Sequence, residues 1–190
     1  ALSKEYIELE IIQSYIANPT CTIILFENPP YAETTSMEHQ RTGRGKESSG
    51  WKKSYVVEEM KKEVSGAKLN DLSNAFIWSA FKYYLRYETD SYIVFSPVKY
   101  WKSQHLIDKE FLKGFAFNRK HFHTNTDACI MCALWSNKEA SISKIFLEAI
   151  DIKDERLHTI NKKLSIDKIY TLYSQKYYDK RTFPNDDKNA

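Results

Sequence analysis

The sequence is poor in glycine, proline and cysteine, and it contains no long apolar run. Its 190 residues include only five glycines and five prolines, while 42% of the residues are hydrophobic and 28% are charged. This balance argues against a fibrous or disordered chain. It predicts a globular protein with one core, or with a small core and an appendage.

The absence of long apolar runs also bears on location. The runs TIILF and ACIMCALW are far shorter than the roughly 20 residues that span a bilayer, and no basic stretch followed by an apolar one opens the sequence. Cys21, Cys129 and Cys132 leave one thiol unpaired in any disulfide scheme, which favours a reducing compartment. We therefore expect a cytoplasmic protein with no membrane partner.

Two of the cysteines form a C-x-x-C motif, which raises the question of a metal site. Cys129 and Cys132 lie in a strand-like run, where period-two alternation points them to opposite faces, and no second cysteine pair is present. His121 and His123 lack a carboxylate partner at ligand spacing. We expect no metal, with the cysteines as apolar filler and the histidines near phosphate or on the surface.

Basic residues are clustered, although the formal net charge of +3 is too small to argue for nucleic acid by itself. The larger cluster has Glu47 as its only acidic neighbour and consists of Arg41, Arg44, Lys46, Lys52 and Lys53. A smaller cluster of three basic residues lies between Lys113 and His123, where no acidic residue occurs.

The first part of the chain predicts a helix, a strand and a long irregular segment. Residues 3–16 begin with Ser3 as a candidate cap and carry apolar residues at helical spacing. Residues 21–27 are β-branched and apolar, which predicts a strand buried on both faces, as in parallel sheets. An irregular segment then extends to about Asn70 with one short helix at 52–64, a pattern typical of functional loops.

The second part alternates helices and strands. In order, the patterns predict a helix over 72–86 capped by Asn70 or Asp71, a strand at 91–98, a helix over 102–113 and two strands within 114–135. This alternation predicts an α/β domain whose parallel sheet ends in an antiparallel pair. Beyond residue 136 we expect a strand at 144–152 and helices at 154–164 and 166–179.

The tetrapeptide Asn28-Pro29-Pro30-Tyr31 directly follows the first predicted strand. Ligands of open α/β sheets bind beyond the carboxyl ends of strands. Two consecutive prolines remove two backbone donors, so this turn presents carbonyl oxygens without competing N–H groups. Together with the amide oxygen of Asn28 and the ring of Tyr31, it suits a planar ligand with an exocyclic amine, such as adenine. The competing interpretation is that the prolines only terminate the strand.

At this point a family resemblance can be stated. The segments ILFENPPY, DLSNAFIWSAFKYYL, SYIVFSP and HFHTNTDACIMCALW resemble, in this order, the second half of the catalytic domain of DNA adenine-N6 methyltransferases of restriction-modification systems. The resemblance covers about residues 20–136. It implies an incomplete Rossmann-like methyltransferase fold over 1–136, ending in an antiparallel β-hairpin, and a mostly helical extension over 137–190 toward a target-recognition region.

The same resemblance implies roles for individual residues. Asn28 and Pro29 would bind the amine of a flipped-out adenine, with marginal contact to the cofactor S-adenosylmethionine, and Tyr31 would stack on the base. Phe122 matches the aromatic residue that the family places against the flipped base, although Phe115 and Phe117 are close competitors.

Double-stranded DNA is the partner that the resemblance implies. Its phosphates would be contacted by the basic residues Arg41, Arg44, Lys46, Lys52, Lys53, Arg119 and Lys120, for which a solvated loop without a partner is the alternative. A protein glutamine methyltransferase, which uses the same tetrapeptide, and a non-catalytic nucleic-acid-binding module remain competing functions.

The cofactor half of the resemblance is missing from this sequence. None of the five glycines forms a G-x-G turn after an apolar strand, and only one short helix precedes residues 21–27. We therefore expect a fragment, or one piece of a split enzyme, in which most of the S-adenosylmethionine site would lie before residue 1. The strand at 21–27 would then have an open edge, and we expect self-association there, a missing N-terminal half, or occupation by the N-terminal helix.

Overall fold

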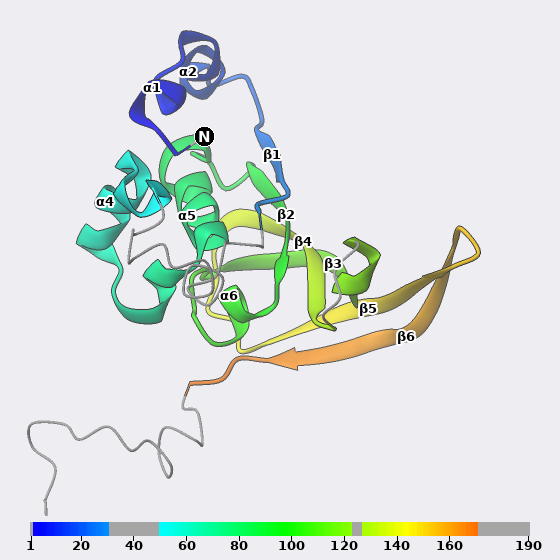
Figure 1. The fold of residues 1–190 in the computed structure, drawn as a ribbon. Helices are drawn as coiled ribbons and strands as arrows, with labels where there is room; N and C mark the ends of the chain where they lie inside the picture. The colour runs from blue at the N-terminus through cyan, green and yellow to red at the C-terminus, as the bar shows by residue number, and fades with distance from the viewer. Residues whose placement is uncertain (1, 31–49, 123–126, 171–190) are drawn as a thin grey trace, which may run out of the picture.

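A six-stranded mixed sheet forms the centre of the computed structural model, which describes residues 2–30, 50–122 and 127–170 (Figure 1). The strand order is β1-β2-β4-β3-β5-β6. The strands are β1 (Ile24–Glu27), β2 (Ser91–Pro97), β3 (Lys109–Asn118), β4 (Cys129–Glu139), β5 (Lys144–Lys153) and β6 (Arg156–Asp167).

The strand directions place the carboxyl ends of several strands on the same side of the molecule. β1 is parallel to β2, β4 is antiparallel to both β2 and β3, β3 is parallel to β5, and β5 is antiparallel to β6. The carboxyl ends of β1, β2 and β3 therefore lie at the same end of the sheet, which we call the carboxyl end of the sheet. The predicted α/β class, with a parallel pair followed by an antiparallel one, is confirmed at this level.

Helices and helical turns cover the sheet and connect its strands (Figure 1). Helix α5 begins after Asp71, as predicted, but the Asp71 side chain does not cap it and instead pairs with Lys99 at 2.6 Å. The elements are α1 (Lys4–Ile7), α2 (Glu10–Ala17), the 3₁₀ turns η1 (Gly50–Lys53), η2 (Gly66–Asn70) and η4 (Arg119–Phe122), α4 (Tyr55–Glu63), α5 (Leu72–Ser79), the π-helical η3 (Ala80–Tyr84) and α6 (Lys99–Lys102).

The predicted N-terminal helix is present in two pieces. Ser3 caps α1, because its Oγ accepts a hydrogen bond from the backbone N–H of Tyr6 at 3.2 Å. The chain then breaks at Glu8 and Leu9 before α2 begins. Ile7 of α1 is buried, whereas α2 has no buried residue, so the second piece is only weakly packed on the rest of the molecule.

The main core lies between the sheet and the helices on one of its faces. Alternate residues of β2 point into it, including Tyr92 and Val94, which are completely buried. Trp101 and Trp135 are also completely buried and their ring centroids lie 6.3 Å apart. A second cluster under α4 and α5 contains Val56, Val57, Met60, Ala75 and Trp78.

β3 lies close to both of its neighbours at Gly114. A Cβ atom at this position would lie 2.6 Å from the Cys132 carbonyl oxygen and 2.9 Å from Leu147 Cδ2. Only glycine fits this approach, which allows β5 to join the sheet and bury Leu147 and Ile145 in the main core.

The predicted helix over 102–113 is wrong. Helix α6 ends at Lys102, and β3 begins at Lys109 and pairs with β4. The pairing register shifts on both sides of Phe111, which interrupts the period-two alternation that marks a strand. Pairing with β4 therefore outweighs a local pattern that favoured a helix.

The predicted helix over 154–164 is also wrong, because these residues turn into β6 and pair with β5. Asp154 and Glu155 form the tight turn with φ angles of 49° and 58°. Register shifts around Ala149 disturb the alternation, and the exposed face of β6 left no apolar pattern to mark a strand. The described part of the expected helical extension is thus a β-hairpin on the same sheet; residues 171–179 of the other predicted helix lie outside the described residues.

Burial of β1 on both faces was also predicted, and this is wrong. Among the described strands, β1 pairs with β2 alone and occupies the end of the sheet. On the face away from α5, Ile24 and Phe26 are 65% and 61% exposed. An apolar strand has therefore been placed at a sheet edge, where it has a neighbour on one side only.

A buried ion pair fixes the approach of the chain to β1. Asp90 is completely buried and accepts hydrogen bonds from the backbone N–H groups of Ile23, Arg86 and Tyr87. The Arg86 guanidinium pairs with Asp90 at 3.5 Å and donates to the Cys21 carbonyl at 2.8 Å. Burial by itself would raise the pKa of Asp90, but the three N–H groups and Arg86 hold it below its usual value.

Candidate functional site

The first three residues of the tetrapeptide directly follow β1, as the sequence predicted, although this strand lies at the edge of the sheet and is not buried on both faces. Pro29 is buried, whereas Asn28 and Pro30 are exposed. Tyr31 lies outside the described residues. Because β1 and β2 are parallel, Asn28 lies at the carboxyl end of the sheet, next to the carboxyl end of β2.

Phe122 also lies at the carboxyl end of the sheet, where the η4 turn follows β3. Its ring is 6.3 Å from that of Phe95 and 5.3 Å from that of Phe117. Phe95 in turn contacts Phe26, two residues before Asn28, at 5.8 Å. The fold therefore brings Phe122 and the tetrapeptide, which are far apart in sequence, to the two ends of one row of aromatic rings.

The competitors for the role of Phe122 take different positions. Phe115 and Phe117 both lie within β3, and each contacts Phe95 at 6.1 Å. Phe117 is buried, and Phe115 lies further from the strand end than Phe117. Of the three rings, Phe122 is the one that lies beyond a strand end.

Polar contacts hold the η4 turn in place. The backbone N–H of Arg119 donates to the Ala128 carbonyl at 2.8 Å, and His121 Nε2 lies 2.9 Å from Asp151 of β5. The hydrogen bond from His121 lowers the pKa of the Asp151 carboxyl more than any other cause does. Sequence spacing missed this carboxylate partner of His121, because it lies on β5 and only the fold brings it close.

Lys120 has an acidic partner as well. Its Nζ lies 2.8 Å from the carboxylate of Asp127, which also accepts from Asn118 Nδ2 at 2.7 Å. The pKa of Asp127 is lowered, first by Lys120 and then by Asn118. Part of the positive charge of Lys120 is therefore already neutralised within the chain.

The larger basic cluster is described only in part, because Arg41, Arg44 and Lys46 lie outside the described residues. Lys52 and Lys53 belong to η1, ahead of α4. Lys52 Nζ lies 5.6 Å from the centroid of the Trp51 ring, its carbonyl accepts from Lys61 Nζ at 3.3 Å, and Lys53 is exposed. Both cations are held beside α4, and their role toward DNA remains a prediction.

The C-x-x-C motif follows the predicted alternation of β4. Cys132 is buried, as expected of apolar filler, whereas Cys129 is exposed, so the expectation is wrong for Cys129; all three cysteines are free thiols. Burial raises the pKa of both, to about 11 for Cys132, so they stay protonated near neutral pH. Across residues 2–30, 50–122 and 127–170, no group of three or more histidine, cysteine or acidic side chains is arranged to hold a metal ion.

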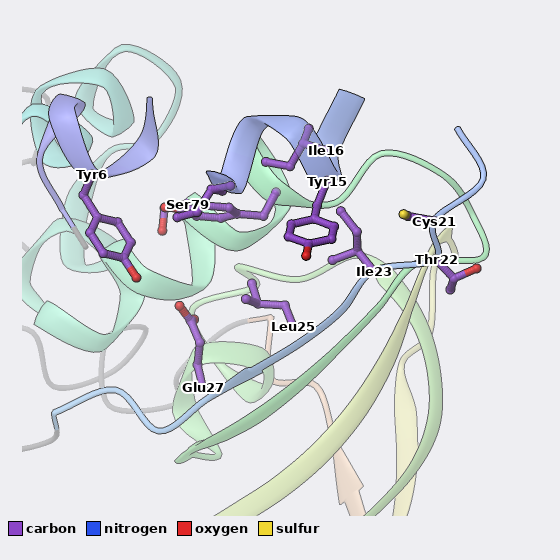
Figure 2. A pocket seen from close by; sticks show the side chains of 11 residues that line it. Tyr6, Tyr15, Ile16, Cys21, Thr22, Ile23, Leu25, Glu27 and Ser79 are labelled. Carbon is purple, nitrogen blue, oxygen red and sulfur yellow. The ribbon is translucent and has the colours of Figure 1, made fainter. Parts of the chain in front are cut away.

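A cavity that the sequence did not predict lies beside β1, between this strand, the N-terminal helices and the end of α5 (Figure 2). Its volume is about 530 Å³. Apolar side chains such as Ile12, Ile16 and Leu25 form most of its wall. No local signal could have revealed it, because it results from the way α2 stands away from the sheet.

Polar groups enter this cavity near the carboxyl end of β1. Glu27 accepts a hydrogen bond from the Tyr92 hydroxyl at 2.6 Å, and burial raises its pKa despite this bond. Tyr6 and Tyr84 also line the cavity. Burial, followed by the nearby Tyr6 and Glu27, raises the pKa of Tyr84 to about 12, so the hydroxyl stays protonated.

The described residues do not fit the whole of S-adenosylmethionine. This cofactor carries an amino-acid end with a carboxylate, a sulfonium, a ribose and an adenine. The cavity beside β1 offers a carboxylate and a few hydroxyls, but no lysine, arginine or histidine among its lining residues to pair with the cofactor carboxylate. No step of a methyl transfer can therefore be assigned to this cavity.

Comparison of the sequence with models of protein families and with curated proteins finds no match. A separate finding concerns membranes: none of the helices in the described parts of the chain is long and apolar enough to cross one.

Proposed function

We propose that this chain carries the adenine-binding part of a DNA adenine-N6 methyltransferase. The observation that carries the proposal is the common position of Asn28, Pro29 and Phe122 at the carboxyl end of the sheet, which the row of rings from Phe26 through Phe95 to Phe122 connects. A planar base needs in-plane acceptors for its amine and an aromatic surface for its face. Asn28 and Pro29 would supply the acceptors and Phe122 the aromatic surface, from segments that are far apart in the sequence.

The chemistry assigned to these residues is orientation of the amine. The Asn28 side-chain oxygen and the Pro29 carbonyl would each accept one proton of the adenine N6 amine. Neither Pro29 nor Pro30 has a backbone N–H, so these two residues add no backbone donor beside the oxygens. Acceptance of both protons raises the electron density on the nitrogen and fixes the direction of its lone pair. The part of the reaction assigned to this chain ends with the amine held in this way.

The first experiment tests the role of Phe122. The probe is a duplex with one adenine opposite an abasic site, because such a base leaves the stack at little cost. Phe122→Ala should weaken binding by about 1–3 kcal/mol, since base stacking on an aromatic ring has this value. Tyr15→Ala is the matched control, because Tyr15 is an exposed aromatic on α2 and 61% accessible. Equal losses in both variants would remove Phe122 from the base site.

The second experiment tests Asn28. Binding is compared between the same duplex and one in which the unpaired adenine is replaced by purine, which lacks the amine. The wild-type chain should prefer adenine by about tenfold, the effect of one or two hydrogen bonds. Asn28→Ala should lose this preference, whereas Asn28→Asp, which keeps the acceptor oxygen, should retain it. A wild-type chain that binds both duplexes equally would contradict the proposal.

A non-catalytic nucleic-acid-binding module is the second candidate, because the described residues do not fit the whole methyl donor. Incubation of the chain with the unpaired-adenine duplex and S-adenosylmethionine labelled in the methyl group separates the two. Label in the DNA supports an enzyme whose chain also binds the methyl donor. Adenine preference without label is the result expected of the adenine-binding part alone, and equal binding of the adenine and purine duplexes without label supports the module. A glutamine-containing peptide that competes with the duplex would instead favour the protein methyltransferase.

A further inference from the structure

The outer edge of β1 presents backbone groups to which no described strand pairs. The Ile23 carbonyl accepts a hydrogen bond from the Ser91 N–H at 2.9 Å, so Ile23 directs its backbone groups toward β2. Successive residues of a strand direct theirs to opposite sides, so Ile24 and Phe26 direct their N–H and C=O groups away from β2. A row of such groups at two-residue spacing is the template that another strand recognises.

The cavity lies on one face of this edge. Ile23, Leu25 and Glu27 point toward it (Figure 2). Ile24 and Phe26 alternate with them along the strand and are more than half exposed on the opposite face. Helix α2 forms its far wall, yet α2 has no buried residue. The N-terminal helix therefore stands beside the edge strand without filling the space next to it.

One buried hydroxyl in the wall of the cavity lacks a hydrogen-bond partner among the described residues. The Tyr84 side chain is 8% exposed, and its hydroxyl has no hydrogen-bond partner among the described residues. A buried hydroxyl of this kind costs free energy until an acceptor reaches it. The nearby Glu27 carboxylate has a hydrogen bond from Tyr92, and none of the described residues that line the cavity is a lysine, arginine or histidine. The missing group therefore carries both an acceptor and a donor, as an amide or hydroxyl side chain does.

Three kinds of occupant can be compared. A small apolar molecule would fill the cavity but would leave the backbone groups of Ile24 and Phe26 unpaired. A second copy of this chain, paired through β1, would bring side chains that already line its own cavity, so both cavities would stay empty. A strand from a different polypeptide satisfies the backbone and the cavity together.

We propose that the outer edge of β1 binds one extended strand of a partner polypeptide, which pairs with the backbone of Ile24 and Phe26 and inserts alternate apolar side chains into the cavity. One amide or hydroxyl side chain of that strand meets Tyr84 and Glu27. The inference goes beyond the proposed function and does not rest on it, because it uses no residue of the tetrapeptide and none of η4.

The probe is a capped synthetic peptide of about ten residues, within the usual range of strand lengths. Leucine occupies alternate positions, threonine the positions between them, asparagine one central cavity-facing position, and lysine both ends for solubility. Fluorescence anisotropy measures its binding to the full chain, and hydrogen exchange follows the amides of Ile24 and Phe26. We expect saturable binding and exchange of these two amides slowed by at least about tenfold.

Two variants test the edge and the cavity separately. Ile24→Pro removes an outward N–H and should weaken peptide binding by about tenfold, whereas the matched Ile24→Thr keeps the N–H and should stay within about twofold. Ile16→Trp fills the cavity from α2 without any change in β1, so it keeps the test valid if the proline variant does not fold. It should weaken binding by a similar factor.

The outcomes are decisive in both directions. Binding that both Ile24→Pro and Ile16→Trp weaken supports the proposal. Absence of binding to the folded chain overturns it, and so does binding that neither variant changes. A dimer in sedimentation that protects the same amides without peptide would replace it by self-association. Since no DNA or methyl donor is present, failure here leaves the proposed adenine site untouched.

Discussion

Strands β1 and β2 have similar apolar sequences and are paired in parallel, yet their environments differ. On the core face, Tyr92 and Val94 of β2 are completely buried, whereas Leu25 of β1 is only partly covered. On the other face, Ile24 and Phe26 are more than half exposed, whereas Phe95 of β2 packs against four phenylalanine rings. The difference comes from neighbours: β2 lies between two strands and β1 has one.

This comparison shows why an apolar run alone does not establish burial. Both strands would lower their free energy by a similar amount if fully covered, because the hydrophobic effect scales with the area removed from water. Only β2 obtains that area within the described residues. The stability of the molecule should therefore depend strongly on the centre of the sheet and weakly on β1. The exception is Asp90, a buried carboxylate at the start of both strands.

The largest expected effect is at the centre of the sheet. Trp135 is completely buried, contacts the rings of Trp101 and Phe111, and donates to the Tyr100 hydroxyl at 3.4 Å. Trp135→Ala should lower the free energy of unfolding by about 3–5 kcal/mol, because it removes a large side chain and leaves a cavity. Chemical denaturation measures it. A loss no larger than that of a β1 variant would break the contrast between centre and edge.

The next effect is at the junction where both strands begin. Asp90→Asn keeps the shape but removes the charge that three backbone N–H groups and Arg86 stabilise, so the free energy of unfolding should fall by about 1.5–3 kcal/mol. Asp127→Asn is the matched control, since the Asp127 carboxylate is 67% exposed and should cost less than about 1 kcal/mol.

The same group predicts a pH dependence. The pKa of Asp90 in the folded protein lies below its usual value of 3.8, so its contribution is complete above that value. Stability should be lost as the pH falls through 3.8 toward the folded pKa, and Asp90→Asn should lack this part of the decrease. Denaturation of both proteins between neutral pH and pH 3 measures it; identical pH profiles would show that Asp90 is not stabilised as an anion.

The smallest effect is at the edge itself. Phe26→Thr removes an exposed ring whose contact is with Phe95, and threonine also favours strands. The free energy of unfolding should change by less than about 1 kcal/mol, the range of one aromatic pair at a partly exposed site. Thermal unfolding at several protein concentrations checks this. A large, concentration-dependent loss would show that β1 is covered by another copy in solution.

Local signals predicted the elements whose patterns survive undisturbed in the fold. The alternation at 91–98, the cap at Ser3 and the helix that begins after Asp71 are examples. The first five residues of β3 and most of β6 were predicted as helices. Register shifts interrupt the alternation in both strand pairs, and such shifts depend on the partner strand. The burial of β1 was predicted wrongly for a related reason, because the sequence of a strand does not show how many other strands will pair with it.

For the candidate site, the sequence located one side and the fold supplied the rest. Asn28, Pro29 and Pro30 directly follow a strand of the sheet, as their pattern predicted. The position of Phe122 on the same row of rings required the insertion of β4 between β2 and β3. The contact of His121 with Asp151 and the cavity beside β1 had no sequence signal, because their members come from separate elements.

The sequence by itself determined the chemistry of this protein's short segments: acceptors without competing donors at Asn28 and the prolines, β-branched strands, and a small net charge. These properties are local, because they depend on side chains and on backbone donors within a few residues. The tertiary structure decided which strand lies at the edge, which rings meet Phe26 and Phe95, and where α2 leaves a cavity. Strand order and packing depend on contacts between residues that are far apart in the sequence, so they cannot be predicted from any single segment.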